Sequence, residues 1–439
     1  MLNRTSVQTP LYLALALILG LGFSLVFAQT SRDWPGLVLV VLAIAVIVLL
    51  ILPHMAWRER SRFLMQVLIV GLILKLGTSM VRLWASFDLY QGVADASGYH
   101  GWGILIAQHL RQMEFDRVAP FLESGTNFVR FFTGLVYAAI GPTLYGAYLI
   151  YGLLAFIGAY YFYRAFREAF PEGNRVLYAL LIFFFPSILF WPNGMSKDAL
   201  MLFSIGLSTY GSVLLLRQRL WGMAPLALGL FGALSVRPHV AGILAVSLAL
   251  AFLIPKATKV TTRAGTYLVG MAIAASLLWF MLPRAMAFIG LEQLSLGTSL
   301  DYYGRLQSLT FQGGSAFRAP DIRNPLAFPM AAVTVLFRPF PWETHNIQAL
   351  VQSLVGVLLL GVVLWRIRSL THVIVSSLSD PVLRYVLTYI AIFIVAFSFI
   401  GNFGILARQQ TMVLPFVFML LAYSPRQHQV MSPVKEIAT

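Results

Sequence analysis

The stretch FLMQVLIVGLILKLGTSMVRLW, residues 63–84, is apolar over a length that would cross a membrane as a single helix. A helix rises about 1.5 Å per residue, so roughly 20 apolar residues cross the ~30 Å hydrocarbon core of a bilayer. Similar stretches recur along the chain. They predict about twelve membrane helices, at residues 11–28, 35–53, 63–84, 143–163, 175–193, 199–216, 221–236, 239–254, 265–283, 347–366, 384–400 and 410–423.

The composition indicates the same class of protein. The chain is 59% hydrophobic and 11% charged, and its mean hydropathy is +0.81. These values lie outside the range of soluble globular domains. We therefore expect an all-α polytopic membrane protein. The absence of cysteine excludes disulfides, thiol catalysis and metal sites with Cys ligands.

The charges are sorted by side, which predicts the orientation of the chain. Short loops rich in Lys and Arg stay on the cytoplasmic side of a membrane. If the N-terminus is cytoplasmic, the inner loops carry 17 of the 31 basic residues and five of the 16 acids, which leaves +12 on that side. We expect a bacterial-type inner-membrane protein with both termini in the cytoplasm. The pI near 10.2 then reflects loops that face anionic lipid, and no nucleic-acid partner is expected.

Four regions follow from this topology. Two N-terminal helices occupy residues 1–62, and the first of them is too long for a signal-peptide core, so we expect it to be retained. Residues 63–283 form a transmembrane core that includes an outer loop at 85–142. Residues 284–346 form a second outer loop, and residues 347–439 form the last helices and a short cytoplasmic tail.

The outer loops are long and contain helical patterns of their own. Residues 101–113 place Trp102 on an apolar face, as in a helix that lies along the membrane surface. Residues 128–141 are apolar but too short to span, and Gly141-Pro142 ends them. Residues 326–337 show a third such pattern. We expect juxtamembrane helices at all three places.

An acid near the start of the first outer loop is the first candidate catalytic residue. Asp95 begins the segment DASGYH, residues 95–100. It would serve as an ordinary turn acid or helix cap, or as a general base that takes a proton from an acceptor hydroxyl. His100 would assist such a base or simply sit at the membrane interface.

The connection FFPSILFWPNGMSKD, residues 184–198, ends in a second pair of charges. Asp198 would complement the dipole of the helix that it opens, or act as a second carboxylate. Lys197 would contact a phosphate.

Several further cations lie at the expected outer side. Arg237 and His239 occupy the very short hairpin VRPH, residues 236–239, where an ionisable group is a candidate functional residue. Arg338 and Arg408 also reach this side, and a guanidinium is well shaped to hold phosphate oxygens. Lys75 lies near mid-span and needs a partner or a water path, so we do not place it in the site.

The order of these features resembles the GT-C superfamily of integral-membrane glycosyltransferases, above all protein O-mannosyltransferases and lipid A aminoarabinose transferases. The acidic segment 95–100, the apolar stretch 128–164 with its Gly-Pro break, and the segment 185–198 carry the likeness, which covers roughly residues 63–254. The chain differs in lacking an adjacent Asp-Glu pair, in having Ser124-Gly125-Thr126 where Pro-Pro is common, and in its two additional N-terminal spans.

The resemblance implies a transferase that uses a polyprenyl-phosphate-linked sugar on the outer face and inverts the sugar's configuration. The acceptor would be a hydroxyl of a glycan, a lipid or a protein. The expected catalytic residues are Asp95 and Asp198, and the expected substrate-binding residues are His100, Lys197, Arg237, His239, Arg338 and Arg408. We expect Asp95, Asp198, Arg237 and Arg408 to converge on one outer chamber. Some members of the superfamily use a divalent cation, Mg or Mn, but the sequence shows no strong metal site.

Other functions stay open at this point. A polysaccharide polymerase or ligase of the O-antigen type also has about a dozen spans and outer arginines. A lipid-linked-sugar flippase or secondary transporter would show repeated halves and a midplane site, and no repeat is apparent here. A non-catalytic scaffold is a further alternative. The chain has no nucleotide-binding P-loop, His-Glu-x-x-His or serine-elbow motif, which argues against ATP-driven transport and metalloproteolysis.

Overall fold

The computed structural model describes residues 34–53, 61–89, 91–92, 94–253, 264–288, 310–311, 315–320 and 324–424. Within these ranges the regular elements are all helices, and the one β contact is an isolated bridge between Ala316 and Asn402. The predicted all-α class is therefore confirmed. The stretch 11–28, expected to be the first membrane helix, lies outside the described residues.

Five helices in the described part of the chain are long and apolar enough to cross a membrane. They are α4 (Arg62–Trp84) with a π-helical segment that continues it to Leu89, α8 (Leu144–Ala169), α11 (Lys197–Leu216), the part Gly270–Phe288 of α14 (Ala264–Phe288), and α17 (Ile347–Trp365). The number rises to seven if two bent pairs each count as one span, namely α18 (Ile367–Ser377) with α19 (Pro381–Phe397), and α20 (Phe403–Gln410) with α21 (Leu414–Ala422). These helices fit a multi-pass membrane protein.

Other predicted spans are shorter helices in the structure. Three of them are α2 (Trp34–Val46), α12 (Met223–Val236) and α13 (Pro238–Leu253). The predicted span 175–193 is interrupted and forms α9 (Arg175–Phe184) and α10 (Pro186–Phe190). Pro186 causes the break, because proline has no N–H to donate and its ring disfavours a helical residue before it.

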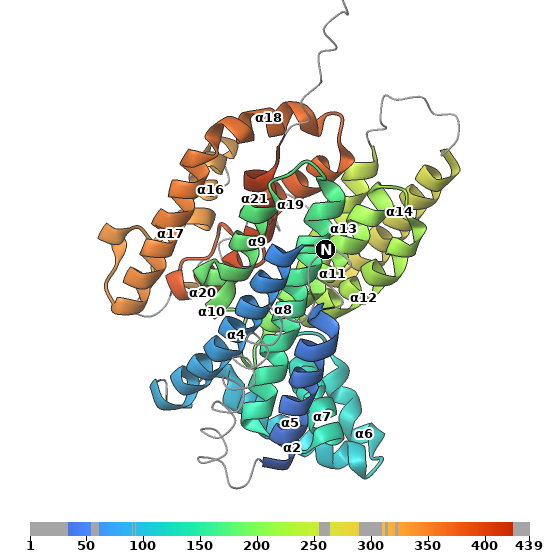
Figure 1. The fold of residues 1–439 in the computed structure, drawn as a ribbon, viewed down its shortest axis with the longest axis vertical. Helices are drawn as coiled ribbons and strands as arrows, with labels where there is room; N and C mark the ends of the chain where they lie inside the picture. The colour runs from blue at the N-terminus through green and yellow to red at the C-terminus, as the bar shows by residue number, and fades with distance from the viewer. Residues whose placement is uncertain are drawn as a thin grey trace, which may run out of the picture.

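The helices predicted in the outer loops are present. α5 (Asp95–Arg111) begins six residues before the expected 101, and α7 (Thr126–Ile140) coincides with the expected 128–141. Gly141 ends α7 with a φ of 89°, a conformation that favours glycine. The third helix is α16 (Phe328–Phe337). Figure 1 shows α5, α7 and the short α6 (Phe115–Val118) together at one end of the molecule, and α18 at the opposite end.

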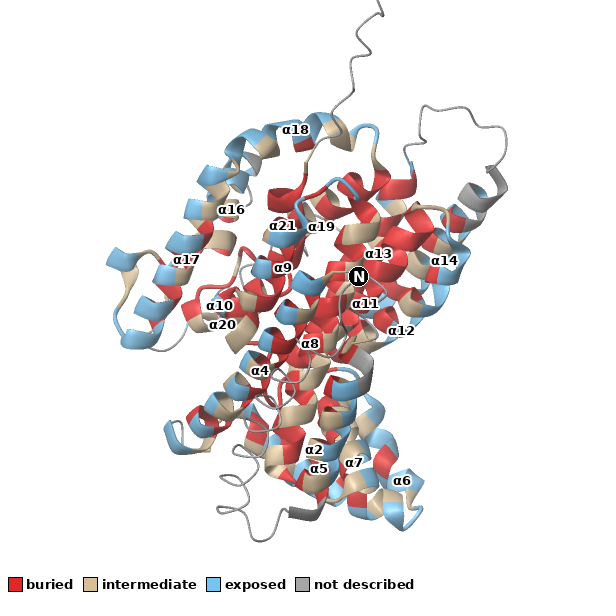
Figure 2. Cartoon of the chain, in the orientation of Figure 1, coloured by how far each residue is buried: buried red, intermediate tan, exposed pale blue. Residues whose placement is uncertain are grey.

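The core of the structure is built around α11. This helix is almost wholly buried, and it packs closely on α8 and α12 (Figure 2). Gly158 of α8 and Gly206 of α11 lie where the two backbones touch, so a Cβ at either position would collide with the partner's main chain. Small residues allow such close packing between membrane helices, which gain little from hydrophobic burial against one another in lipid.

Arginines satisfy helix carboxyl ends at the side opposite α5–α7. The last carbonyl groups of a helix have no intrahelical donor. Arg366 donates to the carbonyls of Leu421 and Tyr423, at 2.7 and 3.0 Å. Arg384 is buried and donates to the carbonyls of Ser377 and Leu378 at the end of α18, at 3.3 and 3.0 Å, and to that of Ala251 in α13, at 3.2 Å. Basic residues of the expected inner side thus also donate to the carboxyl ends of three helices, α13, α18 and α21.

This arrangement makes Arg384 a stability determinant. We expect Arg384→Ala to lower the free energy of unfolding by about 1–3 kcal/mol, because buried carbonyl groups lose their donor. Thermal unfolding of the purified protein in detergent measures the effect. Arg368→Ala, at an exposed position of α18, is the matched control and should change little. Equal unfolding temperatures for the two variants would contradict the assignment.

Candidate functional site

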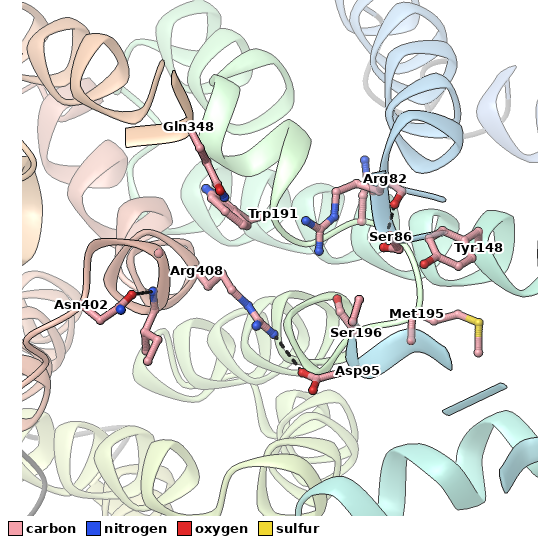
Figure 3. Close-up of a pocket in the computed structure, with 15 residues that line it drawn as sticks. Arg82, Ser86, Asp95, Tyr148, Trp191, Met195, Ser196, Gln348, Asn402 and Arg408 are labelled. Atoms are coloured by element: carbon pink, nitrogen blue, oxygen red, sulfur yellow. Dashed lines mark hydrogen bonds and ion pairs between the residues drawn. The ribbon is translucent and has the colours of Figure 1, made fainter. Parts of the chain in front are cut away.

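A cavity of about 460 Å³ lies where several helix ends and the connection between α10 and α11 meet. Its size is within the range of small-molecule sites, ~300–1,000 Å³. The walls come from α4 and its extension, the start of α5, α8, the α10–α11 connection, the start of α17, and α20 (Figure 3). The lining residues are Arg82, Ser86, Ala94, Asp95, Ala96, Tyr148, Trp191, Asn193, Met195, Ser196, Gln348, Asn402, Gly404, Ile405 and Arg408.

Asp95 stands at the edge of this cavity because it opens α5. Ala94 precedes it with an extended backbone, and Asp95 is the acid of the first helical turn. Its side chain is 63% exposed. An acid at this position stabilises the start of the helix, which agrees with the expectation that Asp95 is an ordinary turn acid or helix cap. Its carboxylate also faces the cavity, so the two interpretations of this residue are compatible.

Asp198 lies deeper and is fully enclosed. The side chain of Ser196 caps α11 by accepting the N–H of Ala199, and this cap places Asp198 in the first turn. The Asp198 carboxylate accepts from Arg237 Nη2 at 2.7 Å and from Arg408 Nε at 3.0 Å, and its side chain is 0% exposed. Asp198 therefore lies behind the cavity and does not line it.

Arg408 connects the buried acid with the exposed one. Its Nε donates to Asp198, while its Nη2 lies 3.7 Å from Asp95 Oδ2 (Figure 3). Exposed ion pairs contribute about 0–1 kcal/mol, whereas removing one partner of a buried pair costs about 3–5 kcal/mol. The guanidinium is thus held firmly on one edge and weakly on the other.

The structure brings Asp95, Asp198, Arg237 and Arg408 together, as expected from the sequence. The guanidinium of Arg237, however, is bound to other protein groups and does not face the cavity. One of its nitrogens, Nη1, donates to Gln409 Oε1 at 2.6 Å and contacts Met412 Sδ at 3.2 Å, and Nη2 binds Asp198. Lys197 donates to Thr126 Oγ1 of α7 at 2.8 Å. Neither cation lines the cavity.

Three other predicted substrate-binding residues lie away from the cavity walls. His100 hydrogen-bonds through Nδ1 with the hydroxyl of Tyr137 in α7, at 2.8 Å. The ring of His239 stacks on Phe288 and meets the ring of Phe397 at a tilted angle. Arg338 pairs with Glu343 at 2.6 Å and lies over a phenylalanine ring. These side chains contact neighbouring segments, and none of the three is among the residues that line the cavity.

Arg82 is a cavity residue that sequence reasoning missed. It lies in the last turn of α4, and its guanidinium is stacked over the rings of Phe190 and Trp191, 5.0 and 5.5 Å from their centres. In Figure 3 it points into the same space as the guanidinium of Arg408. The signal that could have found it is a cation at the expected outer end of a membrane span.

Tyr99 lies one turn after Asp95 on α5 and is buried. Burial raises the pKa of its hydroxyl, and the negative charge of Asp95 raises it further, while Arg408 lowers it. Tyr99 therefore stays a neutral hydroxyl at any physiological pH.

Lys75 has the partner that its depth required. Its ammonium group donates to the carbonyl of Ile188 in α10. Asn193, which lines the cavity, donates to the carbonyls of Leu189 and Lys75 at 2.6 and 3.1 Å. These bonds satisfy carbonyls near the end of the single-turn α10 and hold the cavity wall against α4.

The donor set does not fit a protein-held cation. Among the described residues, no group of three His, Asp or Glu side chains lies close enough to hold a metal ion. Both oxygens of Asp198 accept from arginines, and among the residues that the structure describes Asp95 is the one carboxylate that lines the cavity. The described lining thus offers a divalent cation such as Mg or Mn a single carboxylate ligand.

The chain matches no known family model, no curated protein and no solved structure.

The two carboxylates should respond differently to the same change. We expect Asp198→Asn to lower the free energy of unfolding by about 3–5 kcal/mol, because two arginines lose a buried counter-charge. Asp95→Asn should change it by less than about 1 kcal/mol. Thermal unfolding in detergent compares them. If the Asp198→Asn variant is more stable than the Asp95→Asn variant, the buried contacts of Asp198 with Arg237 and Arg408 do not stabilise the fold.

Proposed function

We propose that this protein is a glycosyltransferase that takes a sugar from a polyprenyl-phosphate donor and transfers it to a hydroxyl acceptor. The observation that carries the proposal is that the Asp95 carboxylate and the Arg408 guanidinium face one cavity at the end of a bundle of apolar helices. A base and a phosphate-binding cation are the two groups that such a transfer needs.

The surroundings of the cavity suit an anionic substrate with an apolar tail. Within the described part of the chain, the cavity is lined by two cations, Arg82 and Arg408, and by one acid, Asp95. The adjoining helices carry apolar outer faces, such as the exposed Leu350, Val351 and Leu354 of α17. A lipid chain can lie along such a face while its phosphate reaches the cavity.

In the proposed reaction Asp95 takes the proton of the acceptor hydroxyl. The acceptor oxygen attacks the anomeric carbon from the side opposite the phosphate, so the configuration of the sugar is inverted. The bond from that carbon to the phosphate oxygen breaks, and its electron pair leaves with the lipid phosphate. Arg408 and Arg82 stabilise the negative charge that develops there.

Asp198 has a positioning role in this proposal. It is enclosed by Arg237 and Arg408, and it touches no cavity space. Its carboxylate fixes the Nε edge of Arg408 and leaves the Nη edge directed at the cavity. The catalytic assignment therefore goes to Asp95 alone.

The wider architecture belongs to the same proposal. It comprises about twelve membrane helices in a GT-C-like arrangement, the cavity on the extracytoplasmic side of a bacterial inner membrane, and cytoplasmic termini. Arg366 and Arg384 lie at helix ends on the side opposite α5–α7, and they support this orientation because positively charged loops stay in the cytoplasm.

Asp95→Asn tests the function directly. We expect the variant to fold and to lose transfer by about 10²–10⁴-fold, the usual contribution of a general base. The assay incubates purified protein with polyprenyl-phosphate sugars and hydroxyl acceptors and measures released lipid phosphate. Asp116→Asn, the same charge change at an exposed position of α6, is the control. Full activity of Asp95→Asn would remove Asp95 from the mechanism.

A further inference from the structure

Arg408 binds two carboxylates that differ in how easily they can be displaced. Its Nε holds Asp198 at 3.0 Å in a fully buried contact. Its Nη2 lies 3.7 Å from Asp95, whose side chain is 63% exposed, at the surface of the cavity. An exposed pair at this distance is weak, so a competing anion can replace Asp95 but not Asp198.

We propose that Asp95 is an internal anion that occupies the phosphate site of Arg408 until the phosphate of a ligand replaces it. The proposal rests on the proposed function for the class of ligand, a phosphate ester of a lipid. An arginine can hold two phosphate oxygens in parallel bonds, whereas it meets Asp95 here through one long contact. The incoming phosphate is therefore the better partner for this edge of the guanidinium.

The other nearby cations are less able to exchange a protein carboxylate for the phosphate of a ligand. Both terminal nitrogens of Arg237 have protein partners, and Arg237 is buried behind the cavity. Lys197 is bound to Thr126. Arg82 lies on the opposite wall from α20 and adds a second positive charge toward the same space (Figure 3). The exchange at Arg408 is thus the place where ligand charge and protein charge compete.

This exchange would couple donor binding to base catalysis. When a phosphate replaces Asp95 at Arg408, Asp95 loses a cation and gains an anionic neighbour. The carboxylate of Asp95 is then released from Arg408 and can accept the hydrogen of an acceptor hydroxyl, so that base catalysis follows donor binding.

A binding experiment tests the exchange without requiring transfer. Isothermal titration calorimetry on the full chain in detergent would use farnesyl phosphate as the probe, inorganic phosphate to separate headgroup from lipid binding, and farnesol as the uncharged control. We expect Asp95→Asn to bind farnesyl phosphate about two- to fivefold more tightly than the unchanged protein, because the ligand no longer displaces an exposed ion partner. Asp116→Asn, with the same net charge, should bind as the unchanged protein does.

A second variant separates exchange at Arg408 from general charge repulsion. Arg408→Lys keeps a cation for Asp198 but lacks the second nitrogen through which Arg408 reaches the cavity while its Nε holds Asp198. In this background we expect Asp95→Asn to give no further tightening. The same tightening in both backgrounds, unchanged or weaker binding by Asp95→Asn, or no binding of farnesyl phosphate by any variant would overturn the proposal.

The outcome is distinguishable from a failure of the proposed function. Tighter binding by Asp95→Asn, together with no transfer by the unchanged protein from any polyprenyl-phosphate sugar, would keep the exchange and reject the transferase. Transfer by the unchanged protein without the binding difference would keep the transferase and reject the exchange. Tightening with inorganic phosphate but not with farnesyl phosphate would place a free anion in the site and would overturn the lipid ester as its ligand.

Discussion

The buried carboxylate of Asp198 is the interaction on which the arrangement of the site depends. It joins three parts of the chain that are far apart in sequence: the start of α11, the hairpin between α12 and α13, and α20. Each charge would be costly to bury alone; Asp198 offsets one of the two positive charges, and Asp95 lies beside Arg408 as the second carboxylate. Because Arg408 is held through Nε, its other edge has a defined direction toward the cavity. The position of Asp198 therefore decides what the cavity presents to a ligand.

Other buried polar side chains repeat this pattern around broken helices. Trp191 donates from its indole to Gln352 at 3.3 Å, Gln352 donates to Gln410 at 3.0 Å, and Gln410 donates to the carbonyl of Val335 at 3.0 Å. The chain of bonds connects the α10–α11 connection with α17, α20 and α16. Where apolar surface offers little preference among packings, such directional bonds select one arrangement. These bonds therefore hold the broken segments at the cavity in one arrangement.

The two ends of the molecule use arginine for different purposes. At one end Arg366 and Arg384 donate to main-chain carbonyls and close the helix ends. Arg82 and Arg408 instead face the cavity, where Nη2 of Arg408 lies beside the exposed carboxylate of Asp95. A guanidinium that is saturated by carbonyls serves stability. A guanidinium that is held firmly on one edge only, such as that of Arg408, can exchange its partner on the other edge. The proposed role of the cavity depends on this exchange.

The sequence by itself determined the helical class, the presence of helices in the outer loops, and the need of Lys75 for a partner. These features follow from local patterns: apolar length, glycine and proline positions, and charge at depth. Only the tertiary structure decided that Arg82 belongs to the cavity, that His100, His239 and Arg338 do not line it, and that Pro186 interrupts a predicted span into α9 and α10. Which charges meet depends on contacts between segments as distant as residues 198 and 408, and the free energy of such a contact is set by burial and by the competing partners. Neither the burial of a charged side chain nor its competing partners can be predicted from the residues that surround it in the sequence.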